Sequence, residues 1–108
     1  MEIFFKDKKI KKLCNSGREA SKKLGTINAK QLQLRLAQLL SVNKLDDFSF
    51  DNPHPLQGDR LGEFSVGLQS GLRIVFKAVE PIPKTKDSAT DWKNVKAIII
   101  IFIGDYHE

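Results

Sequence analysis

The chain has 108 residues, of which 41% are hydrophobic and 29% are charged. This length fits one domain spanning residues 1–108, and the composition supports a buried core and excludes a disordered chain. The 18 lysines and arginines exceed the 13 aspartates and glutamates, for a formal charge of +5. That excess is compatible with a polyanionic partner such as nucleic acid, but it does not require one.

The sequence predicts a cytoplasmic protein. Cys14 is the only cysteine and has no partner for an internal disulfide, which favours a reducing compartment. No signal peptide is visible, because Lys6 follows the opening apolar residues too soon. The apolar run from Ala97 to Ile103 is seven residues long, well below the ~20 that span a bilayer, so no membrane association is expected.

A short strand is expected at Ile3–Phe5, followed by a helix that Asp7 can cap and Gly25 can end. The apolar residues between them recur in steps of three and four, as one face of a helix requires. They are Ile10, Leu13, Cys14, Gly17, Ala20 and Leu24.

A second helix is expected from a cap at Asn28 to about Val42, with four leucines on one side. The short link between the two helices predicts an antiparallel hairpin. Six lysines of the first helix are interpreted as a solvated face, with a phosphate-binding face as the alternative. They are Lys8, Lys9, Lys11, Lys12, Lys22 and Lys23.

Residues 43–62 lose this periodicity and contain two prolines and two glycines, which predicts a loop. The loop holds the polar residues His54, Gln57, Asp59 and Arg60. Of these, Arg60 is a candidate for phosphate contact.

Two strands, EFSVGL and LRIVFK, follow the loop. A three-residue turn with Gly71 in the left-handed conformation sets Leu68 opposite Leu72 and gathers the apolar residues on one face. Arg73 and Lys77 then lie on the other face, beside Gly67, where a ligand could approach. The alternative for Arg73 is an ion pair with Glu63 across the hairpin.

A polar loop at Val79–Asn94 precedes a last strand at Val95–Ile103, which is apolar throughout and should lie centrally in the sheet. The loop could also cover the polar face of the hairpin. The predicted fold class is α+β, in the order β-α-α-β-β-β. A helical hairpin packs on one face of a small, mainly antiparallel sheet, and the other face stays partly open.

The last strand delivers Asp105, Tyr106 and His107 to one end of the sheet. Histidine titrates near neutral pH and can donate or accept a proton in catalysis. Asp105 and Glu108 should favour the protonated form of His107, which suits a general acid or a phosphate clamp. The alternative is that this segment is a solvated tail.

The loop PHPLQGDRLGEFSV, the strand GLRIVFK and the terminal DYH, in this order, resemble the HigB toxins of the RelE/ParE superfamily. In the HigB pattern a His-Pro-Leu-Lys-Gly-Asp-Arg loop precedes a strand, a W-R-I-x-F strand and a terminal D-Y-H. The opening FFKDKKIKKLC and the segment NAKQLQLRLAQL are similar to the two-helix start of a HigB subgroup, so the resemblance covers nearly the whole chain.

The resemblance implies a RelE/ParE-like fold and a toxin of a type II toxin–antitoxin module. Such a toxin is a ribosome-dependent mRNA endonuclease, or mRNA interferase, that cuts translated message in the ribosomal A site without a metal or cofactor. The implied catalytic residues are His54, Arg73, Asp105, Tyr106 and His107.

Each of these residues has a role that fits metal-free cleavage. Arg73 would hold the phosphate oxygens, and Tyr106 would stack on a base or position the 2′-hydroxyl. His54 and His107 are the candidate general acid and general base. Which histidine has which role is left open. Asp105 would orient a neighbour. Arg60, Lys77 and Gln57 are the candidate RNA- and phosphate-binding residues.

The chain departs from the HigB pattern at two of these positions. The lysine between Leu and Gly is Gln57 here, which removes a positive charge near the scissile phosphate. The aromatic residue before the arginine is Leu72. The loop before the last strand is also long.

The resemblance implies an antitoxin partner, a HigA-like helix-turn-helix protein, with operator DNA bound only through the antitoxin complex. Two alternatives stay open. A ParE-like toxin would poison DNA gyrase without nuclease activity, and a degenerate member would retain only antitoxin binding and regulation.

Overall fold

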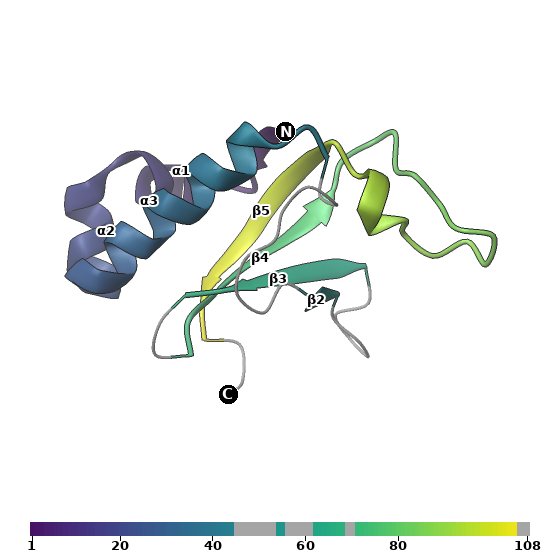
Figure 1. Ribbon diagram of the computed structural model, residues 1–108. Coiled ribbons are helices and arrows are strands. Elements are labelled where there is room, and N and C mark those ends of the chain that lie inside the picture. Colours follow the sequence, from purple (N-terminus) through teal and green to yellow (C-terminus); the bar gives the residue numbers. More distant parts are fainter. Residues whose placement is uncertain (45–53, 56–61, 69–70, 106–108) are drawn as a thin grey trace.

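The computed structural model describes residues 1–44, 54–55, 62–68 and 71–105. It is an α+β structure in which helices lie together beside one face of a mixed sheet (Figure 1). The predicted fold class is confirmed at this level. In the described part of the chain, no helix is long and apolar enough to cross a membrane.

The first predicted helix is two helices, α1 (Lys8–Asn15) and α2 (Gly17–Leu24), and this is a correction. Ser16 separates them in an extended conformation, with its backbone N–H still bonded to the carbonyl of Lys12 and its hydroxyl accepting from the backbone N–H of Glu19. The prediction followed apolar spacing and overlooked that Ser16 and Glu19 have the spacing of a helix start. The predicted cap at Asp7 is confirmed, because its carboxylate accepts from the N–H of Ile10 at 2.9 Å.

The next helix, α3 (Thr26–Ser41), ends close to the predicted position. Its predicted cap at Asn28 is wrong. Gly25 occupies the cap position, with a φ of 86°, and Asn28 is buried inside the helix. The Asn28 amide donates to the carbonyl of Leu24, so it serves the end of α2 instead of the start of α3. The two helices α2 and α3 pack as the expected hairpin.

In the described residues, five strands form the sheet in the order β1-β5-β4-β3-β2 (Figure 1). They are β1 (Glu2–Phe5), β2 (His54–Pro55), β3 (Glu63–Gly67), β4 (Arg73–Ala78) and β5 (Ala97–Gly104). Only β1 and β5 run parallel, so the described sheet is mainly antiparallel, as predicted. The strand β2 lies inside the segment that was predicted to be a loop. It is a short edge strand, where a proline costs no ladder bond.

The predicted register of the hairpin is confirmed. The backbone N–H of Leu68 donates to the carbonyl of Leu72 at 2.8 Å, and Gly71 has a φ of 79°. On one face, Phe64 is opposite Phe76 and both are buried. On the other face the cross-strand pairs are Glu63–Lys77, Ser65–Val75 and Gly67–Arg73.

A bulge divides β5 into two parts. Val75 is opposite Phe102, but the next residue, Phe76, is opposite Ile100, so Ile101 is an extra residue in the ladder. An extra residue reverses which face each later residue occupies. Ile100 therefore lies on the helix-covered face, whereas Phe102 lies on the face that carries Arg73.

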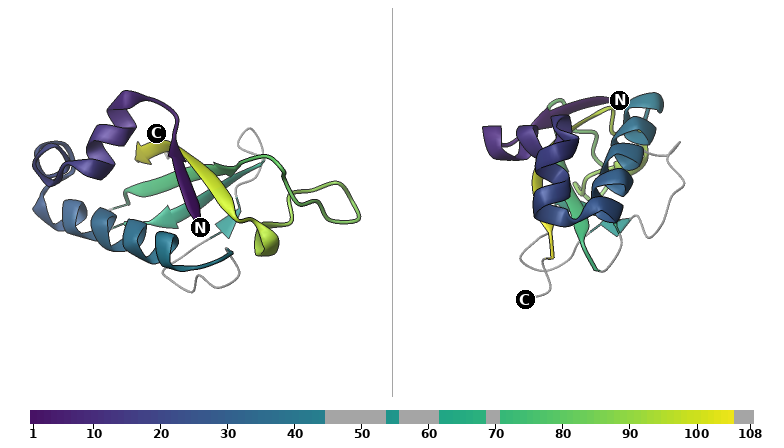
Figure 2. Two further views of the ribbon diagram at one scale, coloured as in Figure 1. Left: turned by 90° about the horizontal axis from the view of Figure 1, so that it is seen from above. Right: turned by 90° about the vertical axis from the view of Figure 1, so that its left-hand side faces the viewer.

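The core lies between the helices and the sheet. Its fully buried members come from α2, α3, β3, β4 and β5, together with Val95 just before β5, as the packing of the helices on one sheet face requires (Figure 2). Trp92, in the 3₁₀ helix η3 (Trp92–Asn94), packs tilted against Phe64 and edge-on against Phe76, with ring centroids 4.9 and 6.1 Å apart. The 79–94 loop thus sends its aromatic residue into the core and not onto the polar face.

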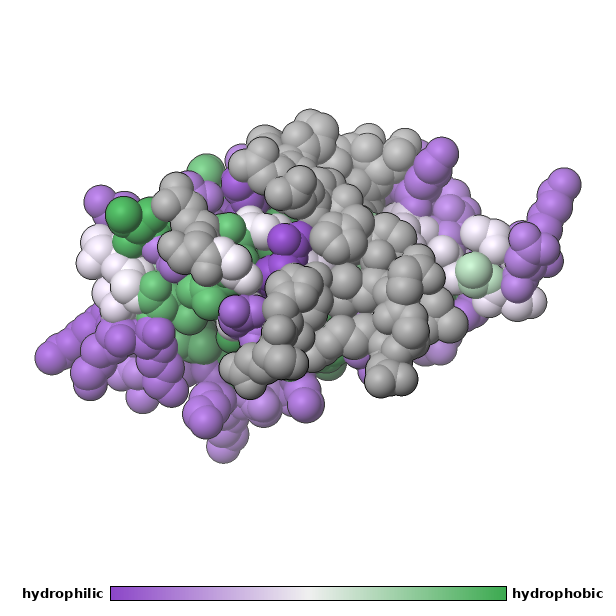
Figure 3. Space-filling model, turned by 90° about the horizontal axis from the view of Figure 1, so that it is seen from below, coloured by the Kyte–Doolittle hydropathy of each residue, from purple (hydrophilic) through white to green (hydrophobic). Residues whose placement is uncertain are grey.

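Seen from below, hydrophilic side chains gather at the helix end of the molecule, with apolar surface beside them (Figure 3). Of the helix lysines, Lys8, Lys9 and Lys11 are all exposed. Their interpretation as a solvated face agrees with this exposure.

Candidate functional site

The sheet face opposite the helices carries a hydrogen bond between Arg73 and Ser65. The Nε of Arg73 donates to the Oγ of Ser65, which is fully buried. Arg73 itself is partly exposed at the start of β4. The guanidinium is therefore held by its inner nitrogen, and its position is fixed more firmly than that of a solvated arginine.

Both cross-strand neighbours of Arg73 are glycines. Gly67 is its partner on β3 and Gly104 is its partner on β5. Neither neighbour places a side chain beside the guanidinium, which agrees with the predicted setting of Arg73 next to Gly67. Gly104 has a φ of 154°, and a Cβ added there would lie 3.1 Å from the Cζ of Phe102. The ring of Phe102 therefore lies against the backbone of Gly104, in the strand next to Arg73.

His54 reaches this region through β2. Its backbone pairs with that of Ser65, the residue that holds Arg73. The sheet thus brings His54 and Arg73 to opposite sides of one serine, although 18 residues separate them in the sequence. Sequence analysis proposed both residues but gave no reason for them to meet.

Asp105 follows Gly104 directly and is exposed. Because Gly104 is the cross-strand partner of Arg73, the terminal segment leaves the sheet beside the arginine. Tyr106 and His107 lie outside the described residues, and so do Gln57, Asp59 and Arg60 of the 56–61 segment.

Lys77 lies on the same strand as Arg73 but away from it. The two are four residues apart on β4, which corresponds to about 13 Å. Lys77 is exposed and stands opposite Glu63. The register therefore sets Glu63 opposite Lys77, and Arg73 opposite Gly67.

The middle of this sheet face is covered. Ser65 and Val75 are cross-strand partners and both are fully buried, while Lys77 at the end of β4 is exposed. The expectation of a partly open face holds at the ends of the strands and not at their centre. At the end of the sheet beside Arg73, Gly67 is buried, whereas Arg73 and Gly104 are partly exposed.

Sequence analysis missed two residues of this site. Ser65 was placed on the correct face but received no role, and only the cross-strand register could have suggested one. Phe102 sat in an uninterrupted apolar run, where no alternation of polar and apolar residues assigns it a face. The bulge at Ile101 decides that Phe102 belongs to the site.

Cys14 is a buried residue of α1, outside the site. Burial raises the pKa of its thiol to about 12. The thiolate is the reactive form of cysteine, so Cys14 is a core residue of α1 and not a nucleophile of the site.

A search against models of known protein families finds no match to this chain, and a search of curated proteins finds none either.

Proposed function

We propose that the protein is a HigB-type toxin of the RelE/ParE superfamily and that it cleaves translated mRNA in the ribosomal A site. The observation that carries the proposal is the backbone pairing that joins His54 to Ser65 and Gly104 to Arg73. It gathers on adjacent strands three segments that carry the HigB-like residues. The order of elements is compatible with a RelE/ParE-like topology when α1 and α2 count as one interrupted helix and the two-residue strand β2 is set aside.

Cleavage of RNA through its 2′-hydroxyl needs a base for that hydroxyl, charge stabilisation at the phosphate, and an acid for the leaving 5′-oxygen. In this proposal Arg73 meets the phosphate with the two terminal nitrogens of its guanidinium, while Ser65 holds the Nε. His54 and His107 are the proton-transfer residues. Asp105 orients a neighbour, and Tyr106 contacts the nucleotide.

Phe102 adds a further group to this scheme. Its ring lies beside Gly104 and next to the strand of Arg73. Phe102 is only partly exposed, and an accessible aromatic face beside a phosphate-binding arginine is a common stacking platform for an unpaired base. Because Gln57 replaces the lysine of the HigB pattern, Arg73 is left with a larger share of the phosphate charge to neutralise.

The proposal includes partners. A helix-turn-helix antitoxin of the HigA type would neutralise the toxin, and operator DNA would be bound only through that complex. The function would be exercised in the cytoplasm, where translating ribosomes are.

The test is inducible expression in a bacterium, with growth and mapped mRNA 5′ ends followed within minutes. The variants are Arg73→Ala, Arg73→Lys and His107→Ala. Lys93→Ala is the control for loss of one positive charge, because Lys93 is exposed on η3, outside the site. The proposal expects new ends inside translated message, lost in the two alanine variants and kept in Lys93→Ala.

The other outcomes lead to the competing functions. Arrest without new mRNA ends, together with stoichiometric inhibition of gyrase supercoiling, would replace the nuclease with a ParE-like toxin. Absence of arrest in the unmodified protein would leave a regulatory, antitoxin-binding role. Full toxicity of His107→Ala would contradict the acid–base scheme.

A further inference from the structure

The strand β1 forms one edge of the sheet, with β5 on its other side. The backbone N–H groups of Glu2 and Lys6 donate to β5 residues or to the residue just before them. Because these groups alternate in direction along a strand, the N–H groups of Ile3 and Phe5 point away from β5. Such an edge is a template for pairing with another strand.

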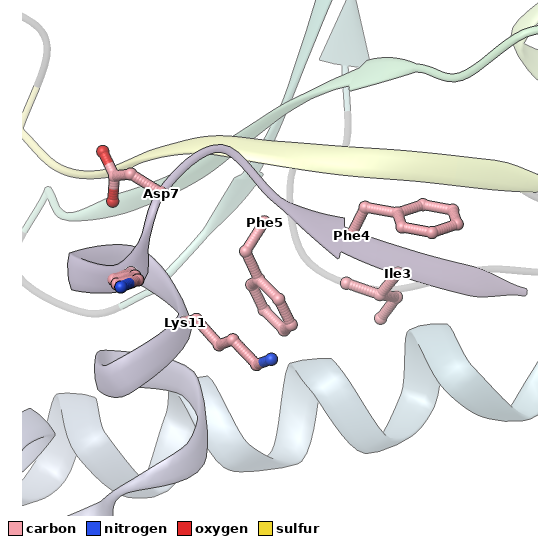
Figure 4. A pocket seen from close by; sticks show the side chains of 6 residues that line it. Ile3, Phe4, Phe5, Asp7 and Lys11 are labelled. Carbon is pink, nitrogen blue, oxygen red and sulfur yellow. The ribbon is translucent and has the colours of Figure 1, made fainter.

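Several side chains form a shallow hollow along this edge (Figure 4). Phe4 is 45% exposed, although it is a large aromatic residue. Lys8 and Lys11 of α1 also line the hollow. Below the strand, Leu40 of α3 is 58% exposed and lines a second hollow that includes Ile3. Among the described residues, no strand pairs with the outward side of β1, so this edge combines unpaired backbone with exposed apolar side chains.

We propose that β1 pairs antiparallel with β1 of a second copy of this chain, about a twofold axis at Phe4. This register follows from the backbone directions. Ile3 of one copy faces Phe5 of the other, and each exchanges its outward N–H and carbonyl with that partner, as a hydrogen-bonded pair requires. Phe4 then faces Phe4 of the second copy, where cross-strand side chains approach most closely.

Charge complementarity favours a second copy over an unrelated peptide. The same register sets Glu2 of each copy opposite Lys6 of the other, which gives two ion pairs from one sequence. Both residues are exposed in the single chain, so neither must be released from another buried position.

A second charge complementarity joins α3 of one copy to α1 of the other. The N-terminal ammonium donates to the carbonyls of Leu40 and Val42, so the C-terminal end of α3 lies beside residue 1. In the pair, that end faces the second copy's hollow with Lys8 and Lys11. The C-terminal end of a helix attracts positive charge, and α3 has no basic residue in its last turn.

The interface is small, because β1 has four residues. We therefore expect a weak dimer with a micromolar dissociation constant. The pairing joins the sheets at the edge opposite β2 and leaves Arg73 and its neighbours outside the interface, so it does not depend on the proposed nuclease activity.

Sedimentation equilibrium of the full chain tests the proposal, with the variants Glu2→Lys, Lys6→Glu and the double variant that carries both. In each single variant, residues 2 and 6 carry the same charge and meet at two places in the dimer, so the dissociation constant should rise about tenfold or more. The double variant again has opposite charges at both places and should dimerise like the unmodified chain. Phe4→Lys should abolish it. Circular dichroism checks that each variant remains folded.

Three results would overturn the proposal. The first is a monomer up to about 1 mM, well above a micromolar dissociation constant. The second is a dimer whose dissociation constant is unchanged in the single variants, or is not restored in the double variant. The third comes from hydrogen exchange: the amides of Ile3 and Phe5 should be protected only as concentration rises. Protection in dilute monomer would mean that another part of the same chain covers the edge.

Discussion

The Nε of Arg73 donates a hydrogen bond to the Oγ of Ser65, and the two residues belong to adjacent antiparallel strands. Ser65 is fully buried, whereas Arg73 is partly exposed. The bond therefore connects a fixed point inside the sheet to a charged group at its surface. It also makes Ser65 the residue that connects the strand of His54 with the strand of Arg73.

Ser65→Ala should destabilise the protein by about 2 kcal/mol, because it removes a buried acceptor from a charged donor. Urea unfolding measures this change. Ser41→Ala is the matched control: Ser41 is exposed at the end of α3, and its loss should change stability by less than about 0.5 kcal/mol. Equal effects of the two substitutions would mean that the Arg73 contact contributes nothing.

The same substitution also has an expected effect on activity. If Arg73 binds the scissile phosphate, Ser65→Ala should reduce mRNA cleavage about tenfold, since a misplaced guanidinium loses part of the transition-state interaction. Cleavage by translating ribosomes supplied with purified protein measures this effect. An unchanged cleavage rate in a folded variant would remove Ser65 from the positioning of Arg73.

Gly104→Ala should destabilise the protein by about 1–3 kcal/mol, because alanine would adopt an unfavourable φ and its Cβ would press on Phe102. Gly17→Ala is the control. No atom lies within 4 Å of a Cβ at Gly17, which starts α2, so that change should be neutral or stabilising by about 0.5 kcal/mol. A stabilising Gly104→Ala would contradict the close approach of the phenylalanine ring.

Ser16→Ala should cost about 1 kcal/mol, because the N–H of Glu19 loses its capping acceptor. Thermal unfolding followed by circular dichroism measures the change, and Asp7→Ala gives a comparison at the start of α1. A gain in both stability and helix content would show that residues 8–24 prefer one continuous helix.

Cys14 should react with iodoacetamide much more slowly in the folded protein than in urea at pH 8–9, because burial raises the pKa of its thiol to about 12. The neutral thiol is the form that the folded state prefers. Its contribution to stability should thus be complete below the ordinary pKa of 9.0 and decline as the pH rises toward about 12. Labelling at the unfolded rate would contradict this burial.

The hairpin was predictable in detail because two local rules agreed. Gly71 allows the left-handed turn residue, and only one register places Phe64 and Phe76 on the same buried face. The helix cap at Asp7 was predictable for the same reason, since it needs only local spacing. The spacing of a helix cap also identifies Ser16. It was missed because the apolar residues before and after it continue at the spacing of a single helix.

The arrangement of the site was less predictable because it depends on contacts distant in sequence. Nothing near His54 indicates that it pairs with Ser65, since a two-residue strand that contains a proline has no periodicity. The face of Phe102 depends on an extra residue in a run in which every side chain is apolar. Composition predicts that β5 lies inside the sheet, where β1 and β4 flank it, but only pairing with β4 decides which residues face Arg73.

The bulge at Ile101 makes the pairing of β5 as important as its composition. If the strand kept all its residues and paired without the bulge, Phe102 would turn toward the helices and Ile103 toward the arginine, although every side chain in the run would still be apolar. A related sequence that lacks the extra residue can instead pair regularly and still place its phenylalanine beside Arg73, so a single-residue gap at this point moves no later side chain to the other face. Residue-by-residue comparison of such proteins should therefore be anchored separately on Ile100 and on Gly104.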